Sequence, residues 1–380
     1  MEIYLDNAST TQPFPEVIDA IKPYLSAEYG NPSSAYSIGR RVRKAIDEAR
    51  DTIASLVGAR PGEISFCSGA TESICTLLIG AALATKEGRR KFVTSSIEHK
   101  AVLKIAHWLM DYLNWDVTLI DPMPSGHIDP DDFVAACSQG CGLASLMWVN
   151  NEIGTIQPIE EVASRLRKIG VLFHTDIVQG VGKMALHLDG TGIAMASASS
   201  HKFYGPKGCG FSYIREGVDV RPLIVGGGQE LERRAGTENV TGIIGTATAL
   251  ALLAGIRDEF KEKTTELEKT FLDTLNSYGV EYSVNGGEPK VPGMINIYFP
   301  GVESESLLIH ADREGICISA GSACSSGSTD PSYVITALGG NRIRGLSSVR
   351  MTFGWHNTID EARTGAKIIT GIVAKLRGRT

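Results

Sequence analysis

The chain has 380 residues, of which 43% are hydrophobic and 21% are charged, and its formal net charge at pH 7 is −6. This composition excludes a largely disordered chain and allows two or three domains. The acidic balance argues against direct binding to nucleic acid, since phosphate binding relies on clustered positive charge. Apolar stretches fall well short of the ~18 residues of a membrane span, and the first residues show no secretory signal, so we expect a cytoplasmic protein without membrane contact.

Seven cysteines occur along the chain, an odd and modest number for this length. A disulfide framework is therefore not expected, and any special cysteine should act through its reactivity. Only Cys137 and Cys141 lie close together at helical spacing, and no matching Cys or His pair stands near them. We therefore predict no metal site.

The first clear helical pattern follows Ser37, whose side chain can cap a helix, and it ends at Gly58. Short apolar strands and helical patterns then alternate as far as residue 214. The expected strands are Glu63–Cys67, Lys91–Ser95, Val117–Asp121, Leu143–Val149, Val171–Thr175, Ala194–Ala198 and Gly210–Ile214. The expected helices between them are Ser73–Ala84, Ala101–Leu113, Asp129–Cys137 and Ile159–Ile169. This βαβ alternation predicts an α/β fold around a mostly parallel sheet.

A long helix is expected over Val240–Ser277, and its polar second half suits a bridge between domains. The rest of the chain mixes strands and helices and predicts a second, α+β domain. The expected strands are Glu281–Val284, Gly293–Phe299, Ile316–Ser319 and Ser348–Phe353, and the expected helices are Ser304–Arg313, Pro331–Leu338 and Ile359–Leu376.

The segment Ser199–Gly208 follows an apolar strand and holds Lys202 among small hydroxyl residues and a glycine turn. A lysine there can form a Schiff base with a carbonyl cofactor, while Ser199 and His201 donate to a phosphate. A surface loop with a solvated lysine would have a similar composition. The polar residues at neighbouring strand ends favour the cofactor lysine.

Asp176 ends the preceding buried strand, at the sheet edge where open α/β folds bind ligands. It can pair with the ring nitrogen of pyridoxal 5′-phosphate (PLP) and keep the ring an electron sink. Gln179 follows three residues later and can donate to the phenolic oxygen of the ring. An aspartate at this place can also cap a helix.

Three more strand ends carry polar residues. Thr71 lies in Ser68–Ser73, where the free amides of a helix N-terminus can hold a phosphate, although Gly-x-Thr is also a plain capping turn. His99 can stack on a flat heterocycle or serve as a structural residue, and Asn151 offers an amide at the same edge. The sequence has no Gly-x-Gly-x-x-Gly or Walker-type motif, which disfavours dinucleotides and nucleoside triphosphates.

In this order the motifs resemble those of class V, fold-type-I PLP enzymes, and specifically the group I cysteine desulfurases of the nitrogen-fixation and iron–sulfur-assembly type. The resembling segments are 4–11, 30–34, 69–73, 98–99, 149–154, 174–179, 199–208, 226–230, 234–239, 319–326 and 347–350. The resemblance implies the fold-type-I transferase fold. Its large PLP-binding α/β domain, with a mostly parallel seven-stranded sheet, would span residues 15–257. Residues 1–14 and 258–380 would form a smaller α+β domain that carries the catalytic cysteine loop.

The resemblance also implies roles for single residues. Lys202 would carry PLP and His99 would stack on its ring, both with catalytic roles. The residues implied to bind the cofactor are Ala70, Thr71, His99, Asn151, Asp176, Gln179, Ser199, His201, Lys202 and Thr237. Thr237 would reach the phosphate of the other subunit, which implies a homodimer. Asn31 and Arg350 would hold the substrate carboxylate, with the guanidinium binding in bidentate fashion.

Cys324 stands in Ser322–Ser328, a stretch of small residues with almost nothing apolar to bury. The resemblance implies that its thiolate takes sulfur from L-cysteine as a persulfide, leaves L-alanine, and passes the sulfur to an acceptor protein for iron–sulfur cluster assembly or thiolation. The length of the loop favours the group I branch. A selenocysteine lyase or a PLP-dependent C–S lyase on the same fold is the alternative.

Overall fold

A seven-stranded sheet forms the centre of the molecule in the computed structural model, which describes residues 2–321 and 330–378. The strand order is β2-β8-β7-β6-β5-β3-β4. β8 is antiparallel to both of its neighbours, and the other neighbouring pairs are parallel. The strands are β2 (Ile64–Cys67), β3 (Lys91–Ser95), β4 (Asp116–Ile120), β5 (Cys141–Ser145), β6 (Leu172–Asp176), β7 (Met195–Ser199) and β8 (Gly210–Ile214). The predicted α/β class and mostly parallel sheet are confirmed.

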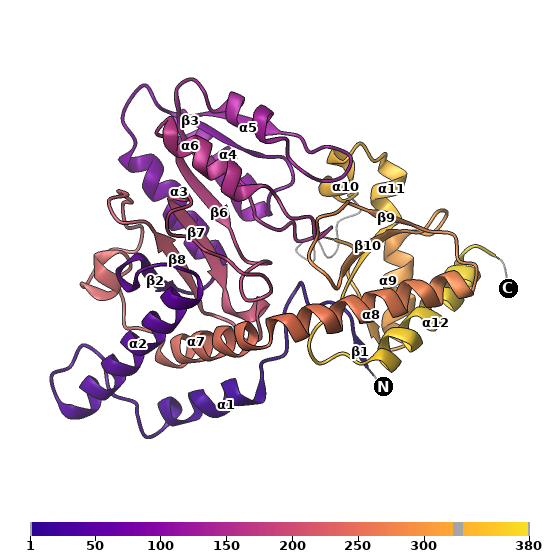
Figure 1. Cartoon of the computed structure of the whole chain (residues 1–380), viewed down its shortest axis with the longest axis horizontal. Coiled ribbons are helices and arrows are strands. Elements are labelled where there is room, and N and C mark those ends of the chain that lie inside the picture. The colour runs from indigo at the N-terminus through magenta and orange to yellow at the C-terminus, as the bar shows by residue number, and fades with distance from the viewer. Residues whose placement is uncertain (1, 322–329, 379–380) are drawn as a thin grey trace.

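Helices cover both faces of this sheet (Figure 1). Apolar residues of α3 and α4 form one buried cluster with the sheet, and those of α2, α5, α6 and α7 form another. The helices are α1 (Pro15–Ile21), α2 (Ser37–Leu56), α3 (Ala70–Ala84), α4 (Lys100–Leu113), α5 (Pro130–Ala136), α6 (Ile159–Lys168) and α7 (Val240–Gly255). The result is a three-layer α/β/α arrangement that leaves the carboxyl ends of the parallel strands accessible.

The predicted cap at Ser37 is wrong. Helix α2 begins at Ser37 itself, its N-cap residue is Tyr36, and no side chain caps it. Gly58 does follow the helix, with a φ of 60° that favours glycine.

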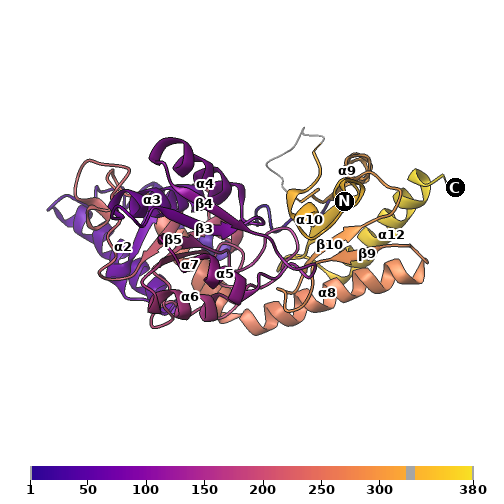
Figure 2. The same cartoon turned by 90° about the horizontal axis from the view of Figure 1, so that it is seen from above.

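The single long helix predicted over Val240–Ser277 is in fact two helices. α7 ends at Gly255, and α8 (Arg257–Ser277) continues at an angle of 73° after Ile256, whose backbone is not helical. Glycine is a poor helix former, so a break beside Gly255 costs little. The bend directs α8 away from the central sheet to pack against α12 (Ile359–Leu376), as Figures 1 and 2 show.

The C-terminal part has its own hydrophobic cluster, which joins α8, α9 and α12 to a small antiparallel sheet of order β12-β10-β9. The N-terminal strand β1 pairs with β11 in parallel beside it. The elements are β1 (Ile3–Tyr4), β9 (Ser283–Asn285), β10 (Met294–Tyr298), α9 (Ser304–Arg313), β11 (Ile316–Cys317), α10 (Tyr333–Ala337), α11 (Arg342–Leu346) and β12 (Ser348–Thr352). The division at residues 14/15 and 257/258 stays a prediction.

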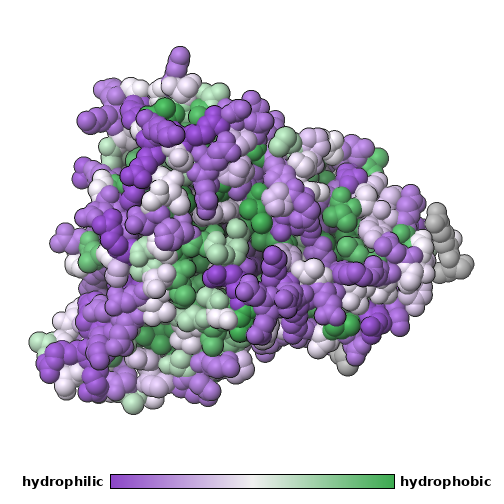
Figure 3. All heavy atoms as spheres, in the orientation of Figure 1, coloured by the Kyte–Doolittle hydropathy of each residue, from purple (hydrophilic) through white to green (hydrophobic). Residues whose placement is uncertain are grey.

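The face seen in Figure 3 is largely hydrophilic, with hydrophobic residues gathered toward its middle. Within residues 2–321 and 330–378, no single helix is long and apolar enough to cross a bilayer. The bent pair α7 and α8 together has the length and the apolar composition of a span. Over the same ranges, no group of three His, Cys, Asp or Glu residues could hold a metal ion.

Candidate active site

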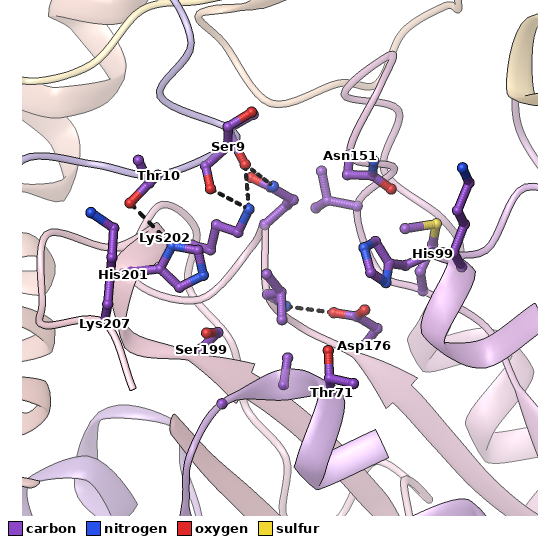
Figure 4. Close-up of a pocket in the computed structure, with 18 of the residues that line it drawn as sticks. Ser9, Thr10, Thr71, His99, Asn151, Asp176, Ser199, His201, Lys202 and Lys207 are labelled. Atoms are coloured by element: carbon purple, nitrogen blue, oxygen red, sulfur yellow. Dashed lines mark hydrogen bonds between the residues drawn. The ribbon is translucent and has the colours of Figure 1, made fainter. Parts of the chain in front are cut away.

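A cavity of about 540 Å³ lies at the carboxyl ends of the parallel strands (Figure 4). This is the edge at which open α/β sheets bind ligands, and the volume suits a small cofactor with its substrate. The structure brings ten of the predicted residues to its wall: Ala70, Thr71, His99, Asn151, Asp176, Gln179, Ser199, His201, Lys202 and Arg350.

Two predicted residues, Asn31 and Thr237, are not part of this wall. Asn31 is exposed, and its side chain accepts a hydrogen bond from Ser33 N at 2.9 Å. Thr237 is also exposed and lines a separate cavity of about 140 Å³. Cys324 lies outside the described residues.

Lys202 follows β7 in a short 3₁₀ turn, and its side chain points toward the N-terminal segment (Figure 4). Its Nζ donates to the carbonyl oxygens of Ala8 and Ser9, both at 2.7 Å. Ala8, Ser9 and Thr10 therefore line the cavity opposite the sheet. Residues 4–11 belonged to the resembling segments, but nothing in their composition indicated contact with the lysine.

Asp176 ends β6 and is 5% exposed. Its Oδ1 accepts a hydrogen bond from Val178 N at 2.9 Å, so the carboxylate is fixed by the turn that follows the strand. Burial raises the pKa of Asp176 to about 6, against the opposing effects of this hydrogen bond and of Lys202. A buried carboxylate of this kind gains most from a cationic N–H partner, such as the protonated nitrogen of a pyridine ring.

His99 takes the structural role considered for it, and its stacking on a heterocycle stays a prediction. Its Nδ1 accepts a hydrogen bond from Ala101 N at 3.1 Å and so caps α4, while its ring faces the cavity. Burial lowers the pKa of His99 to about 4, helped by the charges of Lys202 and Lys100. The ring is therefore neutral at physiological pH, with its proton on Nε2, and presents a flat aromatic surface.

The N-terminus of α3 provides an anion site. Gly69 precedes the helix with a φ of 149°, a conformation that favours glycine, and an added Cβ would lie 3.4 Å from Ser199 Oγ. The amides of the first helical turn, the Thr71 hydroxyl and Ser199 then meet where the helix dipole favours negative charge. His201 lies beside them, with its Nδ1 3.2 Å from Thr10 Oγ1. This donor set fits a phosphate group.

Arg350 reaches the cavity from β12 and is 2% exposed. Its Nη1 donates to Asn151 O, and its Nη2 donates to Asp6 Oδ1 and Ser9 Oγ, each at 2.7 Å. Its Nε has no hydrogen-bond partner among the residues described. A buried guanidinium with unused donor capacity suits a carboxylate ligand.

Comparison with known proteins shows the family of the chain. The family model described as "Aminotransferase class-V" matches residues 3–364. The chain belongs to the aminotransferase class-V family.

Relatives of this class-V chain cover nearly its whole length. A protein of Bacillus subtilis (strain 168) named "Putative cysteine desulfurase IscS 1" is 42% identical over 376 residues, which is 98% of this chain and 99% of the relative. A solved structure named "NIFS-LIKE PROTEIN" has a TM-score of 0.92 at 32% identity and covers 99% of this chain and 100% of its own. Another, described as "SspA in complex with cysteine", has a TM-score of 0.83 at 32% identity, with 94% and 100% coverage.

Glu98 is a buried carboxylate next to His99 of the cavity wall; it belongs to the resembling segment 98–99, but the sequence predicted no role for it in this class-V chain. Its Oε1 accepts hydrogen bonds from Ser95 Oγ at 2.9 Å and from Met147 N at 2.8 Å. Its Oε2 has no hydrogen-bond partner within the described ranges. Burial raises the pKa of Glu98 to about 8, and the charge of Asp176 adds to this rise. Glu98 is therefore largely protonated at neutral pH.

Replacing Glu98 by glutamine should make the protein less sensitive to alkaline pH. The folded chain holds the Glu98 proton up to a pKa of about 8, whereas the ordinary value is 4.5. The folded state therefore binds more protons across this window, and its stability falls as pH rises from about 4.5 to 8. At about 1.4 kcal/mol per pKa unit, Glu98→Gln should gain a few kcal/mol relative to the parent by pH 9. Thermal unfolding at pH 5 and pH 9 measures this, and an equal difference at both values would contradict it.

Proposed function

We propose that this chain is a PLP-dependent cysteine desulfurase that converts L-cysteine to L-alanine and takes the sulfur as a persulfide on Cys324. The observation that carries the proposal is the single cavity that combines Lys202, Asp176 and His99 with a phosphate-type donor set and Arg350. The cysteine desulfurase names of the relatives support the same activity.

The cavity residues divide into two groups for cofactor binding. Ala70, Thr71, Ser199 and His201 would hold the phosphate, and Lys202 would bond the aldehyde carbon. The second group would bind the ring. Asp176 would pair with the ring nitrogen, and His99 would lie against the ring face. Gln179 and Asn151 would lie near the phenolic oxygen. Bound PLP supplies an electron sink that weakens the bonds to Cα of an amino acid.

Arg350 and Lys202 would bind and orient the substrate. Arg350 would bind the carboxylate of L-cysteine, in which case Asp6 must share the guanidinium with it. Lys202 Nζ would move the proton from Cα, and its present contacts with Ala8 O and Ser9 O keep it at the cavity wall. His99 remains neutral and adds no competing positive charge beside Lys202.

Cys324 would complete the reaction. Its thiolate attacks the sulfur of the substrate, so that an S–S bond forms, the Cβ–S bond breaks, and Cβ gains a proton in L-alanine. The composition of Ser322–Ser328 supports this role, because Gly and Ser residues without apolar neighbours give a thiol no packing role. An acceptor protein would then remove the outer sulfur by thiol exchange.

The products of L-cysteine turnover test the proposed activity. A desulfurase with bound PLP should form one alanine for each sulfur transferred. The amount of alanine should therefore equal the sum of enzyme persulfide and acceptor-bound sulfur. A C–S lyase would instead release free sulfide without alanine. Quantified alanine and persulfide mass spectrometry of the protein distinguish the two, and sulfide without alanine would overturn the proposal.

Arg350→Lys should raise the KM for L-cysteine by roughly 10- to 100-fold. Lysine keeps the charge but loses the planar fork, and a charge-assisted hydrogen bond is worth about 1.5–3 kcal/mol. The absorbance of the bound cofactor should not change. Arg344→Lys is the matched control, because Arg344 is not part of the cavity wall. Its Nε donates to Asn285 Oδ1 at 2.6 Å. An unchanged KM in Arg350→Lys would exclude Arg350 as the carboxylate anchor.

We also propose that the active unit is a homodimer. Thr237 is exposed and lies outside the main cavity, as expected for a residue that serves the partner's cofactor. The nearby loop exposes Val225 and Leu231, at 78% and 56%. Light scattering should therefore give twice the chain mass, and Thr237→Ala should weaken PLP binding measured by equilibrium dialysis. A fully active monomer would contradict this assembly.

A further inference from the structure

Glu152 is a fully buried carboxylate beside the cavity, and no step of the proposed reaction uses it. It follows Asn151 in a turn that Asn150 stabilises. Asn150 Oδ1 accepts hydrogen bonds from Glu152 N at 2.9 Å and from Ile153 N at 3.1 Å. The side chain of Asn150 also donates to Ile97 O at 2.9 Å. The backbone that carries Glu152 is therefore fixed relative to the strand ends.

Two segments that are distant from Glu152 in sequence meet its side chain. Ser332 Oγ donates to Glu152 Oε2 at 2.6 Å. Gly321 approaches the same oxygen so closely that an added Cβ would lie 2.4 Å from it. Gly321 also has a φ of 87°, so both its conformation and its surroundings require glycine.

The contacts of these segments lead back to the cavity. Ser319 and Arg350 exchange two backbone hydrogen bonds, and Arg350 Nη1 donates to Asn151 O, the residue before Glu152. Tyr333 follows Ser332 in the chain, and its hydroxyl donates to Glu98 O at 2.7 Å. Glu98 is the residue before His99. Both flanks of residues 322–329 are thus tied to the elements that carry the substrate and cofactor residues.

We propose that Glu152 is a positioning residue that anchors Gly321 and Ser332 beside the cavity and so sets the reach of Cys324, three residues beyond Gly321. This inference rests on the proposed desulfurase function. Glu152 touches neither the substrate nor the cofactor in this role; it acts through the two flanks. Burial raises the pKa of Glu152, and the hydrogen bond from Ser332 opposes this rise.

A buried structural carboxylate would have different consequences from an anchor. Loss of an anchor should lower kcat, because misplacing a reacting group by about 1 Å can cost about 100-fold in rate. It should leave the binding of L-cysteine to the cofactor site unchanged, because Arg350 and Lys202 keep their own contacts. Loss of a purely structural residue would lower thermal stability and cofactor content, and it would not lower kcat selectively while L-cysteine binding stays unchanged.

The experiment compares Glu152→Ala, Glu152→Gln, Ser332→Ala and Ser332→Thr with the parent protein. We expect kcat for alanine formation to fall at least tenfold in Glu152→Ala and severalfold in Ser332→Ala, with the spectroscopic Kd for L-cysteine within twofold. Glu152→Gln and Ser332→Thr keep the acceptor and the donor and should recover most of the rate. Combining the two alanine changes should cost no more than Glu152→Ala alone.

A second measurement does not depend on turnover. Iodoacetamide should alkylate Cys324 more than threefold faster in Ser332→Ala and Glu152→Ala, measured by peptide mass spectrometry, with Cys75 and Cys317 as internal references. Thr336→Ala is the matched control, since Thr336 lies in α10, which Ser332 caps, and its hydroxyl donates to Ser332 O and not to Glu152. Parental kcat and alkylation rates in both alanine variants would overturn the anchor. Alanine formation by Cys324→Ala at the parental rate would instead overturn the proposed function.

Discussion

Cys324→Ala should lose alanine formation from L-cysteine by at least about a thousandfold, the scale expected when an enzyme's nucleophile is removed. None of the six cysteines within the described residues lines the cavity. Cys137, Cys141 and Cys209 are buried, and burial raises the pKa of Cys67 to about 12, which keeps that thiol protonated. The bound cofactor should keep its parental absorbance, because no residue of the described cavity wall changes.

The measurement is a single-turnover assay of alanine with the enzyme in excess over L-cysteine. Cys75→Ala is the control, since Cys75 lies in α3 at intermediate burial and should keep the parental rate. If Cys324→Ala formed alanine as fast as the parent, the persulfide route would be wrong and the C–S lyase would take its place.

Lys202→Ala should bind PLP without a covalent bond and lose about 10²–10⁴-fold in turnover from proton transfer alone. The reason is geometric: Lys202 lines the same cavity as the donors that fit a phosphate and as Asp176. Borohydride reduction of the parent, followed by peptide mapping, should place the pyridoxyl group on Lys202.

Lys207 provides the matched comparison, because it lines the same cavity. Lys207→Ala should still yield a pyridoxyl group on Lys202 after reduction. A pyridoxyl group found on Lys207 in the parent protein would refute the assignment of Lys202.

The site residues at strand ends were predictable because each is a polar residue at the end of an apolar strand, which is a local sequence pattern. Asp176 and His99 follow apolar strands, and parallel strands bring their carboxyl ends to one edge whatever the sequence between them. Arg350 comes from β12, outside the parallel sheet, and only the family resemblance pointed to it.

Features set by distant contacts could not be read from local patterns. The break at Ile256 has only a weak local cause in Gly255, and the final direction of α8 depends on its packing against α12. The anchoring contacts of Glu152 join residues 180 positions apart, so its sequence position beside Asn151 gave no sign of them.

The pairing of the two ends of the chain has a consequence for biosynthesis. β1 can pair with β11 only after residues 316–317 have been made, and Ala8 N donates to Thr352 Oγ1 at 2.8 Å, still later in the chain. The wall that holds Lys202 through Ala8 and Ser9 therefore depends on contacts with residues that are synthesised after it. Contacts of such long sequence separation form slowly. A nascent chain thus lacks the full support of this wall around Lys202 until residue 352 has been made.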